Sequence, residues 1–166
     1  MNSENGYTSG TQEEKMPEPC IMVIFGASGD LTKRMLIPSL YELFLDDLLP
    51  ENFTVVGFSR KEMNDESFRK SMKQAIVDFG EGDILPESDW EKFEKDIYYM
   101  TGAYDDPDSY EKLKDQLDKL DEEKNIKGNI LFYMAVPPDT LPVILENLGK
   151  SGLNKTREDN SWTRII

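Results

Sequence analysis

The chain of 166 residues contains no histidine and only one cysteine. Histidine is the side chain that most often moves protons near neutral pH, so proton-transfer chemistry here would need another residue type. A single cysteine excludes an internal disulfide and a zinc site built from several cysteines. Because Cys20 stands at the head of an apolar run, we interpret it as a core residue. Since the sequence shows neither a membrane span nor a signal peptide, we expect a reducing, cytoplasmic compartment.

Basic charge and long apolar runs are also scarce. The 33 acidic residues outnumber the 19 basic ones, which gives a net charge of −14. This balance excludes a general nucleic-acid-binding surface, which needs a net basic footprint, but it allows a local basic pocket. No apolar run approaches the roughly 18 residues of a membrane span, and no signal-peptide apolar region precedes residue 20. We therefore expect neither nucleic acid nor a membrane as a partner.

Short apolar runs alternate with amphipathic segments along the chain. Residues 1–19 are polar and aperiodic, which predicts a disordered tail. Strands are expected over 20–25, 54–58, 97–101 and 129–136, and helices over 30–45, from 64 or 65 to 79, over 90–94, from 107 onward and over 139–148. Strands that alternate with crossover helices predict an α/β fold, a Rossmann-like, doubly wound parallel sheet in three αβα layers over residues 20–166.

Local signals refine this reading. Pro38 lies past the first turn of its helix, so we expect a kink there. Two helices carry apolar stripes that should be buried: Phe68, Met72, Ala75, Ile76 and Phe79 on one, and Tyr110, Leu113, Leu117 and Leu120 on the other. Gly149 is expected to close the last helix. Residues 164–166 read as the first half of a central strand, so we expect the chain to be a fragment of a longer protein.

The first strand runs directly into a glycine turn, Gly26-x-x-Gly29, followed by a helix. Gly26 permits a sharp reversal, and Gly29 lets the backbone approach a phosphate without a Cβ atom in the way. The amide groups from Ala27 to Leu31 are expected to lack intrahelical partners and to point toward a bound anion. Asp30 is expected to cap the helix. This arrangement is typical of a site for a dinucleotide pyrophosphate.

Side chains of the same turn would add to such a site. Ser28 and Thr32 can supply hydroxyl donors, and Lys33 and Arg34 place positive charge in the first helical turn. Cations there oppose the helix dipole unless a phosphate is bound. A tight strand-to-helix turn with no ligand is the alternative interpretation.

The end of the second strand indicates which dinucleotide would bind. In this fold an acidic residue at that place accepts a hydrogen bond from the ribose 2′-hydroxyl of NAD. Here the strand ends Ser59-Arg60-Lys61, with two cations and no carboxylate. Such cations suit a 2′-phosphate, so NADP is favoured over NAD. Two solvated cations that open a loop are the alternative.

The sequence from Gly26 to Arg34, Gly-Ala-Ser-Gly-Asp-Leu-Thr-Lys-Arg, and the following segment 36–41 resemble the opening signature of glucose-6-phosphate dehydrogenase. The resemblance continues through segments 48–51, 56–60, 131–138 and 164–166, so it covers nearly everything after the tail. It implies NADP-dependent oxidation of glucose 6-phosphate to 6-phosphogluconolactone. The cofactor-binding residues that follow are Gly26, Ala27, Ser28, Gly29, Asp30, Leu31, Thr32, Lys33, Ser59, Arg60, Met134, Ala135, Pro137 and Pro138, the last four beside the nicotinamide.

The sequence departs from the family in two ways. Met35 stands where the family usually has a second lysine after Lys33-Arg34. The family's histidine base and its sugar-phosphate residues would lie in an α+β domain beyond Ile166, so we expect no catalytic residue and no metal site in this chain. Alone it should bind NADP weakly or not at all and turn over no sugar, whereas the full-length protein should be a homo-oligomer.

Two other functions are weighed against this one. A stand-alone dinucleotide-binding or sensor module without catalysis would carry the same glycine turn. A short-chain reductase would need a Ser-Tyr-Lys set, for which Tyr110 and Lys114 have the right spacing. Tyr110 falls on an apolar helix stripe, however, so core packing is favoured for it.

Overall fold

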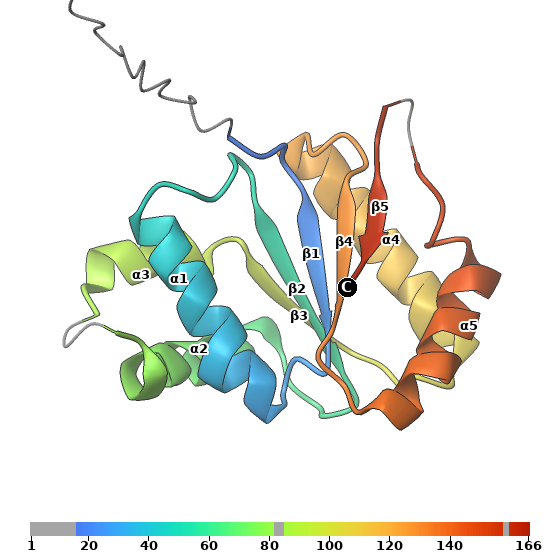
Figure 1. Ribbon diagram of the computed structural model, residues 1–166, viewed down its shortest axis with the longest axis horizontal. Helices are drawn as coiled ribbons and strands as arrows, with labels where there is room; N and C mark the ends of the chain where they lie inside the picture. The colour runs from blue at the N-terminus through green and yellow to red at the C-terminus, as the bar shows by residue number, and fades with distance from the viewer. Residues whose placement is uncertain (1–15, 82–84, 158–159) are drawn as a thin grey trace, which may run out of the picture.

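The computed structural model describes residues 16–81, 85–157 and 160–166 (Figure 1). Its strands are β1 (Ile21–Phe25), β2 (Thr54–Ser59), β3 (Ile97–Thr101), β4 (Ile130–Met134) and β5 (Thr163–Ile165). Its helices are the π-helical η1 (Thr32–Leu36), α1 (Ile37–Leu45), α2 (Asp65–Phe79), α3 (Glu87–Glu94), α4 (Pro107–Lys124), the 3₁₀-helical η2 (Pro138–Thr140) and α5 (Leu141–Ser151).

The five strands form one parallel sheet in the order β3-β2-β1-β4-β5. Helices α1, α2 and α3 cover one face of the sheet, and α4 and α5 cover the other (Figure 1). The predicted Rossmann-like α/β fold is therefore confirmed. The strand order reverses direction between β1 and β4, and in open α/β sheets ligands bind beside the carboxyl ends of the strands at such a point.

The central strand β1 packs on both sides, because successive side chains point to opposite faces of a sheet. Its five residues are all buried. Ile21, Val23 and Phe25 contact the core cluster beneath α4 and α5, whereas Met22 and Ile24 contact the cluster beneath α1, α2 and α3. The continuous apolar run thus fixes a strand with two core layers.

The distortion expected at Pro38 takes the form of a π-helical segment just before it. Proline has no N–H group, and its ring clashes with the carbonyl four residues earlier, so the α-helical ladder cannot continue unchanged. In η1 the N–H of Ile37 donates to the carbonyl of Thr32, which is five residues earlier. The helix widens for one turn between the glycine turn and α1, a position where π-helical turns often accompany functional sites.

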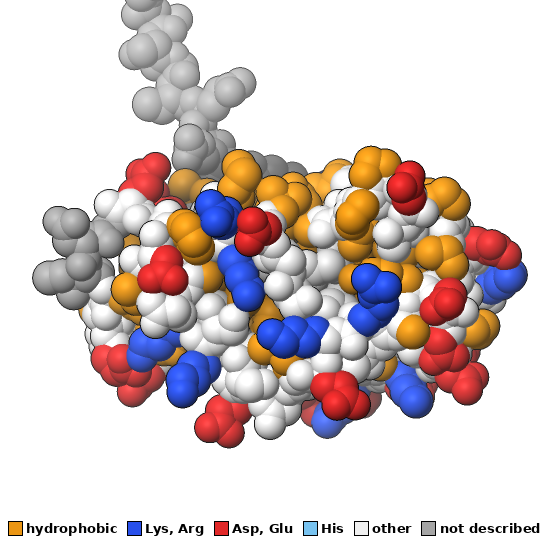
Figure 2. All heavy atoms as spheres, turned by 90° about the horizontal axis from the view of Figure 1, so that it is seen from below, with side chains coloured by type: hydrophobic (Ala, Val, Ile, Leu, Met, Phe, Trp, Pro, Cys, Tyr) orange, Lys and Arg blue, Asp and Glu red, His pale blue; other side chains and the backbone are white. Residues whose placement is uncertain are grey.

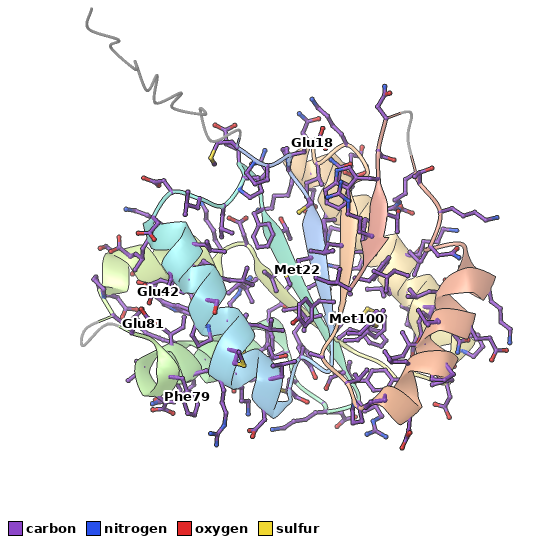
Figure 3. All side chains as sticks on the ribbon, in the orientation of Figure 1. Glu18, Met22, Glu42, Phe79, Glu81 and Met100 are labelled. Carbon is purple, nitrogen blue, oxygen red and sulfur yellow. The ribbon has the colours of Figure 1, made fainter. Side chains whose placement is uncertain are left out.

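Several predicted details are wrong. Phe79 was expected on a buried stripe but is 42% exposed at the outer end of α2 (Figure 3). Gly149 lies inside α5, and Gly152, with a φ of +74°, ends that helix. Strand β4 ends at Met134, before the proline pair. The short strand β5 lies at one edge of the sheet among the described residues, and the expectation that the chain is a fragment of a longer protein stays a prediction.

The residues just before β1 are tied to the sheet. The Nδ2 group of Asn129 donates to the carbonyl of Pro19, and Trp162 Nε1 donates to Glu18 Oε2 at 2.7 Å. Glu18 lies at the amino ends of the strands (Figure 3). The packed part of the chain therefore includes two residues assigned to the tail from sequence, while positions 1–15 lie outside the described residues.

Candidate functional site

A cavity of about 340 Å³ lies at the carboxyl ends of β1, β2 and β4. Four segments form its wall: the glycine turn after β1 and the segments that follow β2, β3 and β4. The lining residues are Gly26, Ser28, Gly29, Ser59, Arg60, Lys61, Tyr104, Ala135, Val136, Pro137 and Thr140. Figure 2 views this end of the molecule and shows several lysine and arginine side chains across its middle, on a protein that is strongly acidic overall.

Gly26 makes the closest backbone approach in the site. Its φ is +84°, a conformation that side-chain-bearing residues rarely adopt. A Cβ atom at this position would lie 2.1 Å from the carbonyl oxygen of Ala135. The turn after β1 and the end of β4 therefore pass each other at backbone contact distance. The positive φ of Gly26 fits the sharp reversal predicted for it, whereas the close approach to Ala135 was not predicted.

Two of the five amide groups expected to be free are in fact used by the chain. The N–H of Gly29 donates to the carbonyl of Gly26 at 2.9 Å, and that of Ala27 lies 3.4 Å from the carbonyl of Phe58. Among the described residues, the amide groups of Ser28, Asp30 and Leu31 have no backbone acceptor. The start of the helix thus offers three donors to an anion instead of five.

Two side chains of the turn have other roles than predicted. Asp30 already lies in the helix, and its carboxylate is 3.3 Å from Arg34 Nε, where the sequence suggested a cap. Thr32 is fully buried, and its hydroxyl donates to the carbonyl of Gly26 at 3.3 Å. The Thr32 hydroxyl therefore holds the turn together and is not directed at a ligand.

Arg60 faces an aromatic ring across the cavity. Its Cζ atom lies 5.5 Å from the ring centroid of Tyr104, within the range of a cation–π contact. The carbonyl of Tyr104 accepts hydrogen bonds from the hydroxyl of Tyr110 at 2.8 Å and from Asn147 Nδ2 at 3.2 Å. Burial raises the pKa of Tyr104, and the nearby Arg60 opposes that rise. Tyr104 is thus a fixed, neutral ring beside the guanidinium of Arg60.

A chain of hydroxyl groups runs beneath the same end of β2. The Oγ atoms of Ser28 and Ser59 are 2.7 Å apart, Ser59 Oγ is 3.1 Å from the hydroxyl of Tyr99, and that hydroxyl donates to the carbonyl of Lys61 at 2.6 Å. A carbonyl only accepts, so the proton of Tyr99 is committed to Lys61. Because each hydroxyl has one proton, Ser59 donates to Tyr99 and Ser28 donates to Ser59.

This direction has a consequence for Ser28. Because the proton of Ser28 is used in the hydrogen bond to Ser59, the Ser28 hydroxyl offers only lone pairs to the cavity. The role predicted for Ser28 was that of a donor. For Ser28 to donate to a ligand, its hydrogen bond to Ser59 must break.

Half of the fourteen residues predicted from sequence line this cavity. Those that line it are Gly26, Ser28, Gly29, Ser59, Arg60, Ala135 and Pro137. The other half is not part of the lining: Ala27, Asp30, Leu31, Thr32, Lys33, Met134 and Pro138. Ala27 is fully buried, and Met134 packs against the core beneath α4 and α5.

Sequence reasoning missed Tyr104, Val136 and Thr140 as lining residues. Tyr104 follows β3 by three positions, and the carboxyl end of a strand in a parallel sheet was a usable signal for it. Tyr110 is fully buried, so its predicted core role is confirmed.

Within the described ranges no group of three or more potential metal-ligating side chains comes together. None of the helices in those ranges is both long enough and apolar enough to cross a membrane.

Comparison with known proteins shows which family this chain resembles. Residues 23–166 match the family model described as glucose-6-phosphate dehydrogenase, NAD binding domain. A glucose-6-phosphate 1-dehydrogenase of Chlamydia pneumoniae is 40% identical over 159 residues, which cover 95% of this chain and 31% of that protein. The corresponding enzyme of Aggregatibacter actinomycetemcomitans is 44% identical over 151 residues, which cover 90% of this chain and 29% of that protein.

A solved structure described as glucose-6-phosphate dehydrogenase in complex with its substrate glucose-6-phosphate superimposes with a TM-score of 0.76 at 25% identity, over 91% of this chain and 30% of that one. The chain thus spans about 30% of the length of the relatives that it matches. A Rossmann-like sheet, a glycine turn at its switch point and a family match over residues 23–166 agree, and the chain belongs to the glucose-6-phosphate dehydrogenase family, of which it carries the NAD binding domain.

Proposed function

We propose that this chain is the NADP-binding domain of an enzyme that oxidises glucose 6-phosphate to 6-phosphogluconolactone. The names of the relatives support the reaction, and the share of their length that is matched supports a domain role in it. The family resemblance implies a histidine as the proton acceptor, and this chain has no histidine, so we propose that the acceptor belongs to the remainder of the enzyme. Sugar binding and turnover are therefore assigned to the remainder of the enzyme.

One observation carries the choice of cofactor: a cation, and no carboxylate, stands at the end of β2 in the wall of the cavity. Arg60 and Lys61 both line it, next to the glycine turn. In a dinucleotide site of this fold, that place meets the ribose of the adenosine half. A guanidinium binds a phosphate through charge-assisted hydrogen bonds, so NADP gains a contact that NAD lacks.

The residues present fit a dinucleotide. Its pyrophosphate would lie against the free amide groups of Ser28, Asp30 and Leu31 at the start of the helix. The close approach of Gly26 to Ala135 leaves no side chain between the turn and β4. The proposed contacts are the predicted residues that line the cavity or offer free amide groups, with Lys33 and Pro138 beside them: Gly26, Ser28, Gly29, Asp30, Leu31, Lys33, Ser59, Arg60, Ala135, Pro137 and Pro138. Ala27 and Thr32 are fully buried and Met134 packs against the core, so these three would support the site without contacting the nucleotide. When bound, NADP would supply the hydride acceptor.

The proposal is tested by nucleotide binding to the 166-residue chain. Nuclear magnetic resonance titration with NADP and with NAD reaches the weak affinities expected of a separate domain. We expect NADP to bind more tightly than NAD, and Arg60→Glu to remove about 1.5–3 kcal/mol from NADP binding with little loss for NAD.

Lys70→Glu provides the matched control, because Lys70 is exposed on α2 and does not line the cavity. It changes the net charge by the same amount, so it measures the long-range electrostatic effect alone. Equal weakening of NADP and NAD by Arg60→Glu would contradict the proposal. If the 166-residue chain alone binds neither nucleotide, the same comparison is made in a chain extended to the family length, where equal weakening contradicts the proposal in the same way.

The same proposal covers the substrate, the assembly and the compartment of the whole enzyme. Glucose 6-phosphate would be the substrate of the whole enzyme, the enzyme would be a homo-oligomer, and its compartment would be the cytoplasm. An extended chain that includes the remaining two thirds of the family length should oxidise glucose 6-phosphate with NADP, which an assay of NADPH absorbance measures directly.

A further inference from the structure

Tyr99 lies beneath the loop that follows β2, although it belongs to β3. Its side chain is 9% exposed and packs on Phe68, with the ring centroids 4.7 Å apart. This ring contact does not involve the hydroxyl group. The hydroxyl can therefore be removed while the ring keeps its place in the core.

Both backbone polar groups of Lys61 are bound by side chains from below. The hydroxyl of Tyr99 donates to the Lys61 carbonyl at 2.6 Å, and the Lys61 N–H donates to Ser59 Oγ at 3.3 Å. Ser59 is itself buried and hydrogen-bonded to Tyr99. Arg60 is thus the exposed residue between two anchored neighbours, and its backbone has little freedom.

We propose that Tyr99 is a positioning residue that sets the preference for NADP over NAD, an inference that rests on the proposed function. Tyr99 is not part of the cavity lining, so it acts through the backbone on either side of Arg60. A long cation that is ordered before the ligand arrives loses less conformational entropy on binding. The Tyr99 hydroxyl supplies that order at the base of Arg60, and Tyr104 supplies it at the guanidinium end.

The ordering of Arg60 by Tyr99 affects the affinity for NADP and not the affinity for NAD. Only NADP carries a phosphate at the position that Arg60 would contact. A looser Arg60 therefore weakens NADP, whereas NAD keeps its contacts with the glycine turn. General damage to the fold would weaken both nucleotides alike, so the ratio of the two dissociation constants separates positioning from folding.

Tyr99→Phe is the direct test, with Tyr98→Phe as the matched control. The control removes a tyrosine hydroxyl from the neighbouring residue of β3, whose side chain points to the opposite face of the sheet. From the usual net value of one hydrogen bond, we expect Tyr99→Phe to weaken NADP binding about three- to tenfold and NAD binding less than about twofold. Tyr98→Phe should leave the ratio of the two unchanged.

Ser59→Ala separates the two parts of the hydroxyl chain. It removes the link to Ser28 and the acceptor of the Lys61 N–H, a contact of 3.3 Å, but leaves the 2.6 Å hydrogen bond from Tyr99 to the Lys61 carbonyl in place. We therefore expect Ser59→Ala to change the ratio of the NADP and NAD dissociation constants by less than Tyr99→Phe does. A larger effect of Ser59→Ala would contradict the assignment to Tyr99.

Amide hydrogen exchange tests, without any nucleotide, whether the Tyr99 hydroxyl orders the backbone at Arg60 and Lys61. Exchange at Arg60 and Lys61 should be faster in Tyr99→Phe than in the wild-type chain, and exchange within α5 should be unchanged. If Arg60→Glu discriminates between the nucleotides but Tyr99→Phe changes neither the ratio nor this exchange, the inference is wrong and the proposed function stands. If Arg60→Glu does not discriminate, the proposed cofactor preference fails, and the inference fails with it.

Discussion

Two cavities of similar size lie at opposite ends of the sheet. The cavity at the carboxyl ends of the strands has about 340 Å³ and contains the glycine turn, Arg60 and Tyr104. The other has about 400 Å³, lies where β2 and β3 begin, and is lined largely by apolar side chains, Phe44 and Phe93 among them. By volume and apolar lining alone, the second would be the better candidate for a ligand.

The polar groups at the two ends instead favour the carboxyl-end cavity as the ligand site. At the carboxyl end, a strand-to-helix turn leaves amide donors free and Arg60 points at an aromatic ring. At the amino end, aromatic rings pack on one another, with Phe44 and Phe93 5.3 Å apart between centroids, and Lys92 pairs with Asp89. Free backbone donors beside a cation identify an anion site, and cavity volume does not.

The largest expected effect on stability comes from adding a side chain to the glycine turn that lines the carboxyl-end cavity. In Gly26→Ala the new Cβ would lie 2.1 Å from the Ala135 carbonyl oxygen on a backbone with a φ of +84°. Strain and overpacking together should lower the free energy of unfolding by about 4 kcal/mol. Urea denaturation measures this change, and nucleotide binding should be lost with it.

Gly149→Ala is the control for that substitution. Gly149 lies inside α5, and the nearest atom to an added Cβ is Asn154 Nδ2 at 3.9 Å. Alanine should therefore raise the free energy of unfolding by about 0.5–1 kcal/mol. If the two substitutions destabilised the chain equally, the close approach at Gly26 would not be a special feature of the carboxyl-end site.

A substitution that removes a large side chain at the amino end tests whether that end takes part in nucleotide binding. Phe93 is 5% exposed and contacts the rings of Tyr41 and Phe44. Phe93→Ala should cost about 3 kcal/mol of stability because a large buried ring is lost. The ratio of NADP to NAD affinity, measured under conditions where the variant is folded, should stay at the wild-type value. A changed ratio would mean that the amino-end cavity takes part in nucleotide binding.

The smallest effect concerns Asp106, which caps α4 two residues after Tyr104. Its carboxylate accepts hydrogen bonds from the Ser109 hydroxyl at 2.7 Å and from the Asp108 N–H at 3.3 Å. The Ser109 hydrogen bond is the main reason why the pKa of Asp106 lies below its usual value.

A group whose pKa is lowered on folding stabilises the fold above its unfolded-state pKa, and this contribution is lost as the pH falls through the folded-state pKa. Asp106→Ala should thus be less stable than wild type at neutral pH, and the gap should shrink in acid. Unfolding curves at both pH values measure it, and a gap that grew in acid would contradict the cap.

The sequence predicted the fold well because its signals were local and repeated. The unbroken apolar run of β1 predicted a strand buried on both faces, and Pro38 predicted a helix irregularity. Helix ends were less accurate: Gly149 could not be told from Gly152, since both are glycines near the end of an apolar stripe, and only one has the positive φ of a helix terminator.

The site was predicted in part, for a similar reason. The glycine turn and Arg60 follow from the order of residues along the chain. Tyr99 in β3 and Tyr104 in the loop after it are far from Arg60 in sequence, and their contacts with Arg60 and Lys61 depend on strand order. The occupied amide groups of Ala27 and Gly29 depend on the exact path of the turn, which a glycine pattern does not specify.

The most direct test of the comparison is a map of where NADP binds. Nuclear magnetic resonance titration of the wild-type chain should perturb the amide signals of Gly26 to Leu31, of Arg60 and Lys61, and of Ala135, with NAD causing smaller changes at Arg60 and Lys61. Signals of Phe44, Phe53 and Phe93 should not move. Perturbations centred on these three phenylalanines, with the glycine turn unaffected, would contradict the account.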